Sequence, residues 1–82
     1  RLSLYQFEAC PFCVRVRFTL KRLGLPIEIR DAKNNPEYKN ELMEKGGQYQ
    51  VPCLKIENEQ GAVQWLYESS AIIQYLESRF AA

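Results

Sequence analysis

A proline and a glycine enclose the first helix that the sequence predicts, and this helix constrains the fold of the whole chain. Pro11 is favoured at the first position of a helix, where its missing N–H leaves no hydrogen bond unmade, and Gly24 is typical of the residue that ends one. Between them apolar side chains recur at helical spacing, at Cys13, Val16, Leu20 and Leu23. Residues 2–6 and 27–30 predict short strands on either side. Because a helix connects these strands, we expect them to be parallel.

The second half of the chain predicts a hairpin followed by a helix. Asn35 and Pro36 are typical of a helix start, and Gln60-Gly61 is typical of a tight turn between two strands. The expected elements are a helix over 36–44, strands over 51–57 and 62–66, and a last helix capped by Ser69 or Ser70. The predicted order is β-α-β-α-β-β-α. The compact solution for this order is an α/β fold, with a four-stranded mixed sheet flanked by helices on both faces.

Length and composition limit the classes of protein to which the chain can belong. With 82 residues, of which 46% are apolar, we expect one domain over residues 1–82. Lysine and arginine total 11 against 10 acidic residues, which argues against a nucleic-acid-binding surface. No stretch approaches the apolar run of about 20 residues that crosses a membrane, so we expect no membrane contact from this segment. We also expect a monomer.

The cysteine content indicates the cellular compartment. The chain has three cysteines, and an odd number argues against a disulfide scaffold. A Cys-x-x-Cys pair beside a strand–helix–strand pattern instead indicates a redox motif in a reducing compartment, so we expect a cytoplasmic protein. The chain begins at Arg1, and a segment before it could carry a signal that changes this expectation.

The Cys10-Pro11-Phe12-Cys13 motif lies where the first predicted strand meets the first helix. Cys10 directly precedes the helix, so the unpaired N–H groups of Phe12 and Cys13 point toward its sulfur and favour loss of its proton. Only the thiolate attacks disulfides, which makes Cys10 the candidate nucleophile. Cys13 lies in the first helical turn, close enough to attack a mixed disulfide on Cys10. The alternative is that both are small core residues without chemistry.

Some charged side chains near the motif favour the Cys10 thiolate, and one disfavours it. A basic stripe follows the predicted helix, formed by Arg15, Arg17, Lys21 and Arg22. We interpret it as a solvated helix face, which also raises the positive potential near Cys10. Glu8 works the other way, because a nearby carboxylate disfavours a thiolate.

A metal site is the alternative chemistry for the two cysteines. A structural zinc site usually needs four Cys or His ligands, and the chain has three cysteines and no histidine. An iron–sulfur cluster shared by two chains stays an alternative if outside thiols complete its ligands, although Pro11 stiffens the loop that would open around the metal. We expect no metal. Cys53 falls inside a predicted strand, and we interpret it as a buried cysteine without chemistry.

Two further segments serve either structure or a ligand. A proline at position 52, inside a predicted strand, indicates a strand start, an edge or a cis bond. The backbone of Val51 would then be available to an extended, peptide-like ligand. Glu68-Ser69-Ser70 can cap the last helix, and the same groups can bind the α-carboxylate and α-amino groups of a ligand. The residues themselves leave both readings open.

Taken together, these segments resemble glutaredoxins, with a clear similarity to the N-terminal domain of the glutathione S-transferases. The Cys-Pro-Phe-Cys motif is similar to the glutaredoxin active site, Gln50-Val51-Pro52 to the segment with the family's cis-proline, and residues 67–73 to the transferase segment that holds the γ-glutamyl group. The resemblance implies a thioredoxin-like fold, with glutathione as reductant and co-substrate. The glutathione-binding residues that it implies are Phe12, Gln50, Val51, Pro52, Glu68 and Ser69.

The chain differs from the family pattern at residues near the thiolate, before the last helix, and in the part of a transferase that follows this domain. Many glutaredoxins carry a basic residue three positions before the first active-site cysteine, where this chain has Phe7. Many also have a Gly-Gly and an acidic pair before the last helix, where this chain has Tyr67-Glu68-Ser69. Full transferases continue into an all-helical second domain, which residues 1–82 do not contain.

From these residues and the resemblance we expect a glutathione-dependent thiol–disulfide oxidoreductase. The Cys10 thiolate attacks a glutathionylated or disulfide-bonded protein, and either a second glutathione or Cys13 resolves the mixed disulfide. The alternatives are a glutathione-ligated iron–sulfur carrier, a glutathione-conjugating enzyme and a thioredoxin-like protein reduced by a flavoenzyme.

Overall fold

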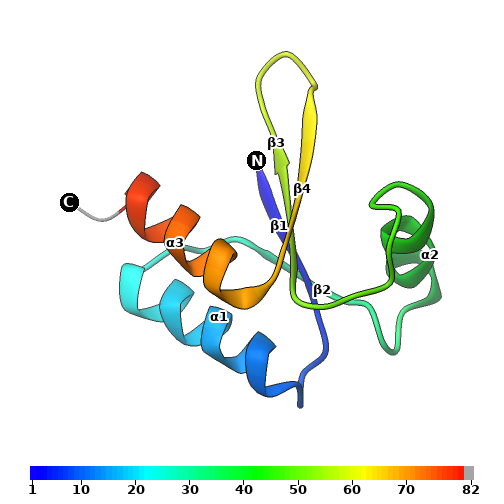
Figure 1. The fold of residues 1–82 in the computed structure, drawn as a ribbon, viewed down its shortest axis with the longest axis horizontal. Helices are drawn as coiled ribbons and strands as arrows, with labels where there is room; N and C mark the ends of the chain where they lie inside the picture. The colour runs from blue at the N-terminus through cyan, green and yellow to red at the C-terminus, as the bar shows by residue number, and fades with distance from the viewer. Residues whose placement is uncertain (81–82) are drawn as a thin grey trace.

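Within residues 1–80, which the computed structural model describes, four strands and three helices follow one another in the predicted order (Figure 1). The elements are β1 (Leu2–Gln6), α1 (Pro11–Leu23), β2 (Glu28–Asp31), α2 (Pro36–Glu44), β3 (Cys53–Glu57), β4 (Val63–Tyr67) and α3 (Ser69–Phe80). The single domain that the sequence predicts extends to residue 82, and its last two residues lie outside the described part.

The strands form one mixed sheet in the order β2-β1-β3-β4. β1 and β2 are parallel, as expected for strands joined by a helix, and Leu4 of β1 pairs with Ile29. β3 runs antiparallel to β1 and β4, so that Leu54 lies opposite Leu4 on one side and Leu66 on the other. Residues 3–6 of the central strand β1 are all buried, because both faces of the sheet are covered. The predicted α/β fold with a four-stranded mixed sheet is confirmed.

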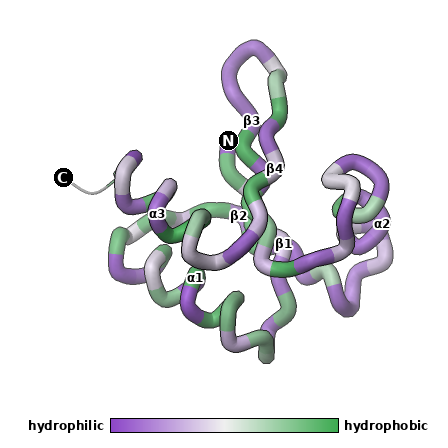
Figure 2. The backbone as a smooth tube through the Cα atoms, in the orientation of Figure 1, coloured by the Kyte–Doolittle hydropathy of each residue, from purple (hydrophilic) through white to green (hydrophobic). Residues whose placement is uncertain are grey.

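Helices cover both faces of this sheet. α1 and α3 pack against each other on one face, and α2 lies on the other (Figure 1). The core on the first face is formed by Leu4, Val16, Leu20, Leu54, Ile72 and Leu76. The core on the second face is formed by Tyr5, Ala32, Leu42 and Cys53. Figure 2 shows apolar residues alternating with polar ones along α1 and α3, as in helices that bury one side.

Local signals end α1 and begin α2 where the sequence predicts them. Gly24 ends α1 in the left-handed conformation, with φ of 68°, and its N–H donates to the Lys21 carbonyl at 3.1 Å. Asn35 caps α2, because its side-chain oxygen accepts a hydrogen bond from the N–H of Glu37 at 3.0 Å. Pro36 then fills the first helical position. In the described part of the chain, no helix is both long and apolar enough to cross a bilayer.

The strands β2 and β4 each begin one residue later than predicted. Ile27 still belongs to a turn, since its N–H donates to the Leu25 carbonyl at 3.1 Å. Ala62 likewise belongs to the hairpin turn, where its N–H donates to the side-chain oxygen of Asn58 at 2.9 Å. Asparagine bonds its own turn in this way and so delays the strand by one residue.

A polar cluster, defined here as Tyr5, Arg30, Glu41 and Lys55, holds α2 against the sheet. The Glu41 carboxylate accepts hydrogen bonds from the Tyr5 hydroxyl and from Arg30 Nη1, the latter at 3.0 Å. It also lies 3.2 Å from Lys55 Nζ. The Lys55 ammonium in turn lies 5.4 Å from the ring centroid of Trp65. One carboxylate of α2 thus joins β1, β2 and β3.

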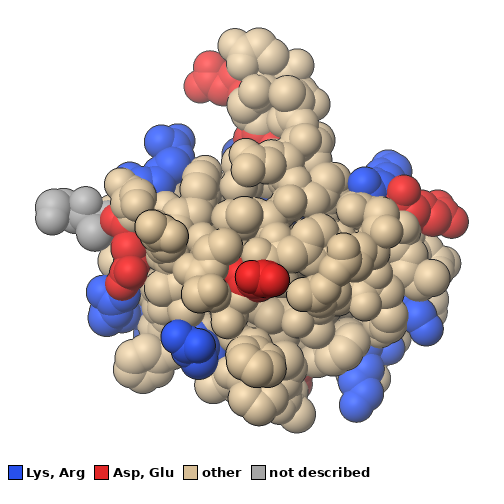
Figure 3. All heavy atoms as spheres, in the orientation of Figure 1, with Lys and Arg blue, Asp and Glu red and all other residues tan. Residues whose placement is uncertain are grey.

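Charged side chains are spread over the surface and do not form a single charged patch on the face shown in Figure 3. In the face shown in Figure 3, lysine and arginine side chains lie around the rim and the centre is largely uncharged, apart from an isolated acidic group. Arg22 of α1 and Glu77 of α3 form an ion pair at 2.5 Å across the two helices of the first face. Both side chains of this pair are about half exposed, so it contributes little to stability.

Replacing Glu41 tests the polar cluster. Burial of the Glu41 carboxyl acts to raise its pKa, but the hydrogen bonds from Tyr5 and Lys55 outweigh it, so the pKa lies below the ordinary 4.5. This contribution to stability is complete above pH 4.5 and is lost as the pH falls through the lowered pKa. We expect Glu41→Gln to lower the free energy of unfolding by about 2 kcal/mol at pH 7. The difference from wild type should shrink in urea titrations at pH 3.

Glu44→Gln is the matched control, because Glu44 lies on the same helix and is exposed. A Glu44→Gln variant that loses as much stability as Glu41→Gln would contradict the role assigned to the cluster.

Candidate functional site

Cys10 stands at the start of α1, in the position that the sequence predicts. Its backbone is extended, with φ of −71° and ψ of 123°, and Pro11 is the first helical residue. The Cys10 carbonyl accepts the N–H of Val14 at 2.9 Å, which begins the helical ladder. The Cys10 side chain caps no backbone N–H. Cys10 is partly buried, and all three cysteines of the chain are free thiols.

The surroundings of Cys10 favour its thiolate. Burial of the sulfur acts to raise its pKa, but the N–H groups of Cys13 and Phe12, the Cys13 thiol and the positive charge of Arg17 outweigh it, so the pKa lies below its usual range. The direction agrees with the prediction from the helix start, where unpaired N–H groups and the helix dipole both favour an anion. A lowered pKa increases the fraction of thiolate at neutral pH.

Cys13 has the opposite character. Its side chain is fully buried, and this burial raises the pKa of its thiol to about 12. The N–H of Phe7 donates to Cys13 Sγ at 3.5 Å from the end of β1. The two cysteines of the motif are therefore unequal: Cys10 is partly exposed and its thiol has a lowered pKa, whereas Cys13 is buried and its thiol has a raised pKa.

Arg17 corrects the prediction of a solvated basic face on α1. Its guanidinium turns back along the helix and donates to the Glu8 carbonyl at 2.8 Å and to the Phe7 carbonyl at 3.4 Å. It also bonds the side chain of Gln6. Arg17 is only partly exposed, because it lies two turns after Cys10 on the side of α1 that faces the connection from β1. The expected positive potential near Cys10 agrees with the effect of its charge on the Cys10 pKa. Arg15 stays exposed, as predicted.

The Val51-Pro52 peptide bond is cis and lies just before β3. β3 was predicted to begin at Val51, but it begins at Cys53, because proline has no N–H to donate to a strand ladder. Cys53 itself is fully buried, and this burial raises the pKa of its thiol to about 12. Its position agrees with the interpretation of a buried strand cysteine.

Glu68, rather than Ser69 or Ser70, occupies the cap position of α3. Ser69 is already the first residue of the helix, and the Glu68 carbonyl accepts the N–H of Ile72 at 3.0 Å. The sequence prediction of a serine cap is wrong by one residue, because Glu68 makes the turn from β4 in the left-handed region, with φ of 72°. A non-glycine residue with positive φ is uncommon, and such residues cluster at functional sites.

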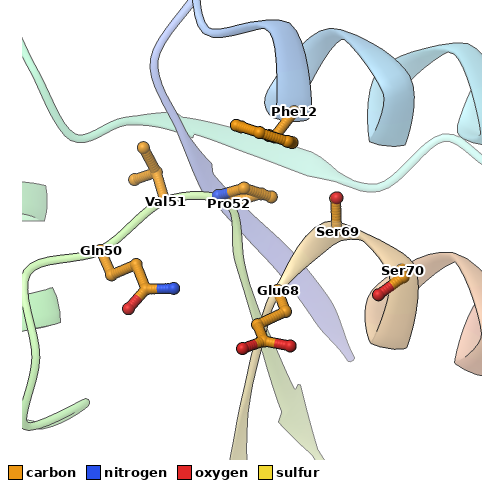
Figure 4. A pocket seen from close by; sticks show the side chains of 7 residues that line it. All are labelled: Phe12, Gln50, Val51, Pro52, Glu68, Ser69 and Ser70. Carbon is orange, nitrogen blue, oxygen red and sulfur yellow. The ribbon is translucent and has the colours of Figure 1, made fainter.

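These separate segments meet around one cavity of about 290 Å³. It is lined by Phe12, Gln50, Val51, Pro52, Glu68, Ser69 and Ser70. Figure 4 shows the hydroxyl of Ser69 directed to the side of the Val51-Pro52 segment on which Phe12 lies, while the polar ends of Gln50 and Glu68 both lie on the other side of that segment. The cavity wall includes all six residues that the resemblance implies for glutathione, and it adds Ser70. Cys10 is not part of the lining and lies two residues before Phe12.

The loop that supplies Gln50 is held at several points. The Tyr67 hydroxyl donates to the Gln48 carbonyl at 3.0 Å, and the Tyr49 hydroxyl donates to the Ala32 carbonyl at 3.1 Å. Gly46 packs so closely that a Cβ there would lie 2.6 Å from the Tyr67 hydroxyl. Loop 46–50 therefore takes its position from both β4 and the end of β2.

Comparison with known proteins decides the family. The sequence profile of the glutathione S-transferase N-terminal domain matches residues 4–82. The chain belongs to this family. Among curated proteins, prostaglandin E synthase 2 of Danio rerio is 40% identical over 95% of the chain, and that of Mus musculus is 33% identical over 95%. The predicted similarity to the transferase N-terminal domain is confirmed, whereas the resemblance to glutaredoxins stays a prediction.

Solved structures agree with a transferase N-terminal domain of thioredoxin-like fold. A maleylacetoacetate isomerase from Anaeromyxobacter dehalogenans with bound GSH in its active site is 30% identical over 96% of the chain, with a TM-score of 0.74. A thioredoxin-like protein is 25% identical over 94% of the chain, with a TM-score of 0.75. The chain spans 37% of that isomerase and 19% of the two curated relatives.

Sequence reasoning predicted two contributors to the site of this transferase N-terminal domain only in part. Ser70 was expected either to cap α3 or to bind a ligand, but it was not among the six residues that the resemblance implies for glutathione. Arg17 was expected to raise the positive potential near Cys10 from a solvated helix face, but its bonds to the β1–α1 connection were not predicted. A signal for Arg17 was present, because residues spaced by three or four along a helix share a face, and Arg17 follows Cys13 by four. Tyr67 and Gly46 had no such signal, since their contact depends on the packing of two distant segments.

Metal ligands are not clustered in the described part of the chain. No group of three or more His, Cys, Asp or Glu side chains within residues 1–80 lies close enough together to hold a metal ion. The expectation that the protein uses no metal stays a prediction, as does the alternative of an iron–sulfur cluster completed by outside thiols.

Alkylation tests the inequality of the cysteines. We expect iodoacetamide at pH 7 to modify Cys10 in the folded protein and to leave Cys13 and Cys53 unmodified, because only thiolates react and both buried thiols have a pKa of about 12. Peptide mapping by mass spectrometry identifies the modified residue. In urea all three should react. Modification of Cys53 as fast as Cys10 in the folded protein would contradict the assignment.

Proposed function

We propose that this domain binds glutathione in the cavity beside α1 and carries out thiol–disulfide exchange at Cys10. The observation that carries the proposal is a helix-start cysteine of lowered pKa two residues before Phe12, which lines a cavity together with the cis Val51-Pro52 segment and Glu68. The family supports glutathione as the ligand, since a related isomerase has GSH bound in its active site.

The cavity offers a suitable partner for each end of glutathione. Glutathione is an extended peptide, and the backbone of Val51 can pair with its cysteinyl part in the manner of an added strand. The Glu68 carboxylate suits the γ-glutamyl ammonium, and the start of α3 at Ser69 suits the γ-glutamyl carboxylate. Phe12 lines the cavity at the start of α1, two residues after Cys10, so this is the end of the cavity at which the proposal puts the sulfur of the ligand.

The reaction follows from the ionised Cys10. Its thiolate attacks the glutathione sulfur of a glutathionylated protein, the protein–glutathione S–S bond breaks, and the protein thiolate leaves and takes up a proton. The thiolate of a second glutathione then attacks the glutathione sulfur on Cys10. This step forms oxidised glutathione and returns the Cys10 thiolate. Glutathione is thus the reductant, and the proposed substrates are glutathionylated or disulfide-bonded proteins of a reducing compartment such as the cytoplasm.

The proposed route uses a second glutathione rather than Cys13 for resolution. A resolving cysteine must reach the mixed disulfide as a thiolate, whereas Cys13 is fully buried and its thiol has a pKa of about 12. Its hydrogen bond to Cys10 instead helps to lower the pKa of the Cys10 thiol. Cys13 then acts as a hydrogen-bond donor to the nucleophile.

Serine variants of the two cysteines test the reaction. We expect Cys10→Ser to lower the rate of deglutathionylation of a glutathionylated peptide by at least roughly 100-fold, since a serine hydroxyl is not ionised at neutral pH. Cys13→Ser should keep activity within about threefold, because serine still donates a hydrogen bond. Full activity in Cys10→Ser would refute the proposed function. An inactive, folded Cys13→Ser variant would refute only the route through a second glutathione.

The glutathione site is tested by Glu68→Gln. The amide keeps the shape of the side chain and removes its charge, so we expect the dissociation constant of reduced glutathione to rise about tenfold, as for the loss of one charge-assisted hydrogen bond. Isothermal titration calorimetry measures this constant. Glu59→Gln, in the exposed hairpin turn, is the control and should bind as wild type does. Equal affinity of the two variants would contradict the proposed place of the γ-glutamyl group.

A second candidate function is glutathione transfer or isomerisation, and the family match favours it. In this function the thiol of glutathione itself is the nucleophile. The Cys10→Ser variant would then keep the transfer activity, so the same variants distinguish the two functions.

A further inference from the structure

The connection between β1 and α1 lacks a cation of its own. Its residues are Phe7, Glu8, Ala9 and Cys10, and the only charge among them is the carboxylate of Glu8. A negative charge near Cys10 disfavours its thiolate. A positive charge in this turn, added to the N–H groups at the start of α1, has to come from another element.

Arg17 reaches this connection from α1. Its guanidinium donates to the carbonyls of both Phe7 and Glu8, and a further bond to the Gln6 side chain ties it to the end of β1. The Phe7 carbonyl also accepts the N–H of Cys10 at 3.3 Å. Arg17 and Cys10 thus share one carbonyl oxygen, so the position of the guanidinium and the backbone of Cys10 are directly linked.

We propose that Arg17 is the positioning residue for Cys10, which holds the turn before the nucleophile and supplies the positive charge that this turn lacks. The proposal rests on the proposed function, in which the Cys10 thiolate is the reacting group. Arginine suits this role because its planar guanidinium donates to two carbonyl groups at once and stays charged at any relevant pH. Lysine could supply the charge, but not the same pair of bonds.

The electrostatic environment supports this assignment. The positive charge of Arg17 acts to lower the pKa of both Cys10 and Cys13. The other charged or titratable groups around the nucleophile are the Cys13 thiol, Glu8 in the turn and Glu68 on the wall of the neighbouring cavity. Arg17 is the charged side chain whose charge lowers the pKa of the Cys10 thiol.

The remaining basic residues of α1 do not share this role. Within residues 1–80, Arg22 is paired with Glu77 of α3, and Arg15 and Lys21 are exposed. None of the three donates a hydrogen bond to the β1–α1 connection in this described part. The positive charge near Cys10 therefore depends on one residue rather than on the stripe as a whole.

The test is the pH dependence of Cys10 alkylation in Arg17 variants. Iodoacetamide reacts with the thiolate, so the midpoint of the rate against pH reports the pKa of Cys10 without any need for glutathione. We expect Arg17→Gln to raise this midpoint by roughly one unit, as for the loss of a neighbouring opposite charge. Arg17→Lys should raise it by less. At high pH the Arg17→Gln and wild-type rates should converge, since the intrinsic reactivity of the thiolate is retained.

Arg15→Gln is the matched control, because it removes the same charge from an exposed position on the same helix. Its midpoint should equal that of wild type. An Arg17→Gln midpoint equal to that of wild type would overturn the proposal, even if activity fell because the turn had loosened. If circular dichroism shows Arg17→Gln to be unfolded, Arg17→Lys decides: a midpoint above wild type supports the linked turn, and an unchanged midpoint overturns it.

The same measurement keeps this inference separate from the proposed function. A wild-type protein that shows a low Cys10 midpoint and its loss in Arg17→Gln, but no exchange with glutathionylated peptide, supports the role of Arg17 and refutes the exchange reaction. Exchange activity that needs Cys10 but shows the same midpoint in wild type and Arg17→Gln refutes the role of Arg17 and leaves the exchange reaction standing.

Discussion

The unpaired N–H groups in the first turn of α1 are the constraint on which the candidate site depends. Every helix begins with donors that have no partner within the helix, and Pro11 sets the position at which this helix begins. The sulfur of Cys10 stands at the N-cap position, where a capping oxygen would otherwise stand. The donors of Phe12 and Cys13 thus act on a group that can ionise. The same backbone geometry that starts the helix therefore prepares a nucleophile.

Much of the fold could be predicted because its signals are local. Pro11, Gly24 and Asn35 act within a few residues of their own positions, and the structure places the corresponding helix ends where these residues predict them. The order of elements then leaves few compact arrangements, so the mixed sheet followed. The predicted start of β3, at Val51, was two residues too early. The apolar residues around Pro52 read alike whether the proline lies inside the strand or just before it.

The site could be predicted only in part, because its residues come together through packing. Phe12, Val51 and Glu68 line one cavity although they are far apart in the chain, and their common place was suggested by the family resemblance rather than by spacing. The direction in which a long side chain turns is a tertiary property, which is why the bonds of Arg17 to the β1–α1 connection were not predicted. The cap at Glu68 was missed for a related reason, since a left-handed turn at a glutamate has no signal in composition.

A ligand in the cavity would stabilise the folded state, because the walls of the cavity belong to different elements. The start of α1, the loop before β3 and the turn into α3 form it only when the sheet between them is assembled. An occupant therefore binds the folded chain and not the unfolded one, and its binding free energy adds to that of folding. At a concentration of 100 times its dissociation constant, such a ligand stabilises a folded protein by about 2.7 kcal/mol. For a domain of this size the cellular level of the ligand would then help to set how much of the chain is folded.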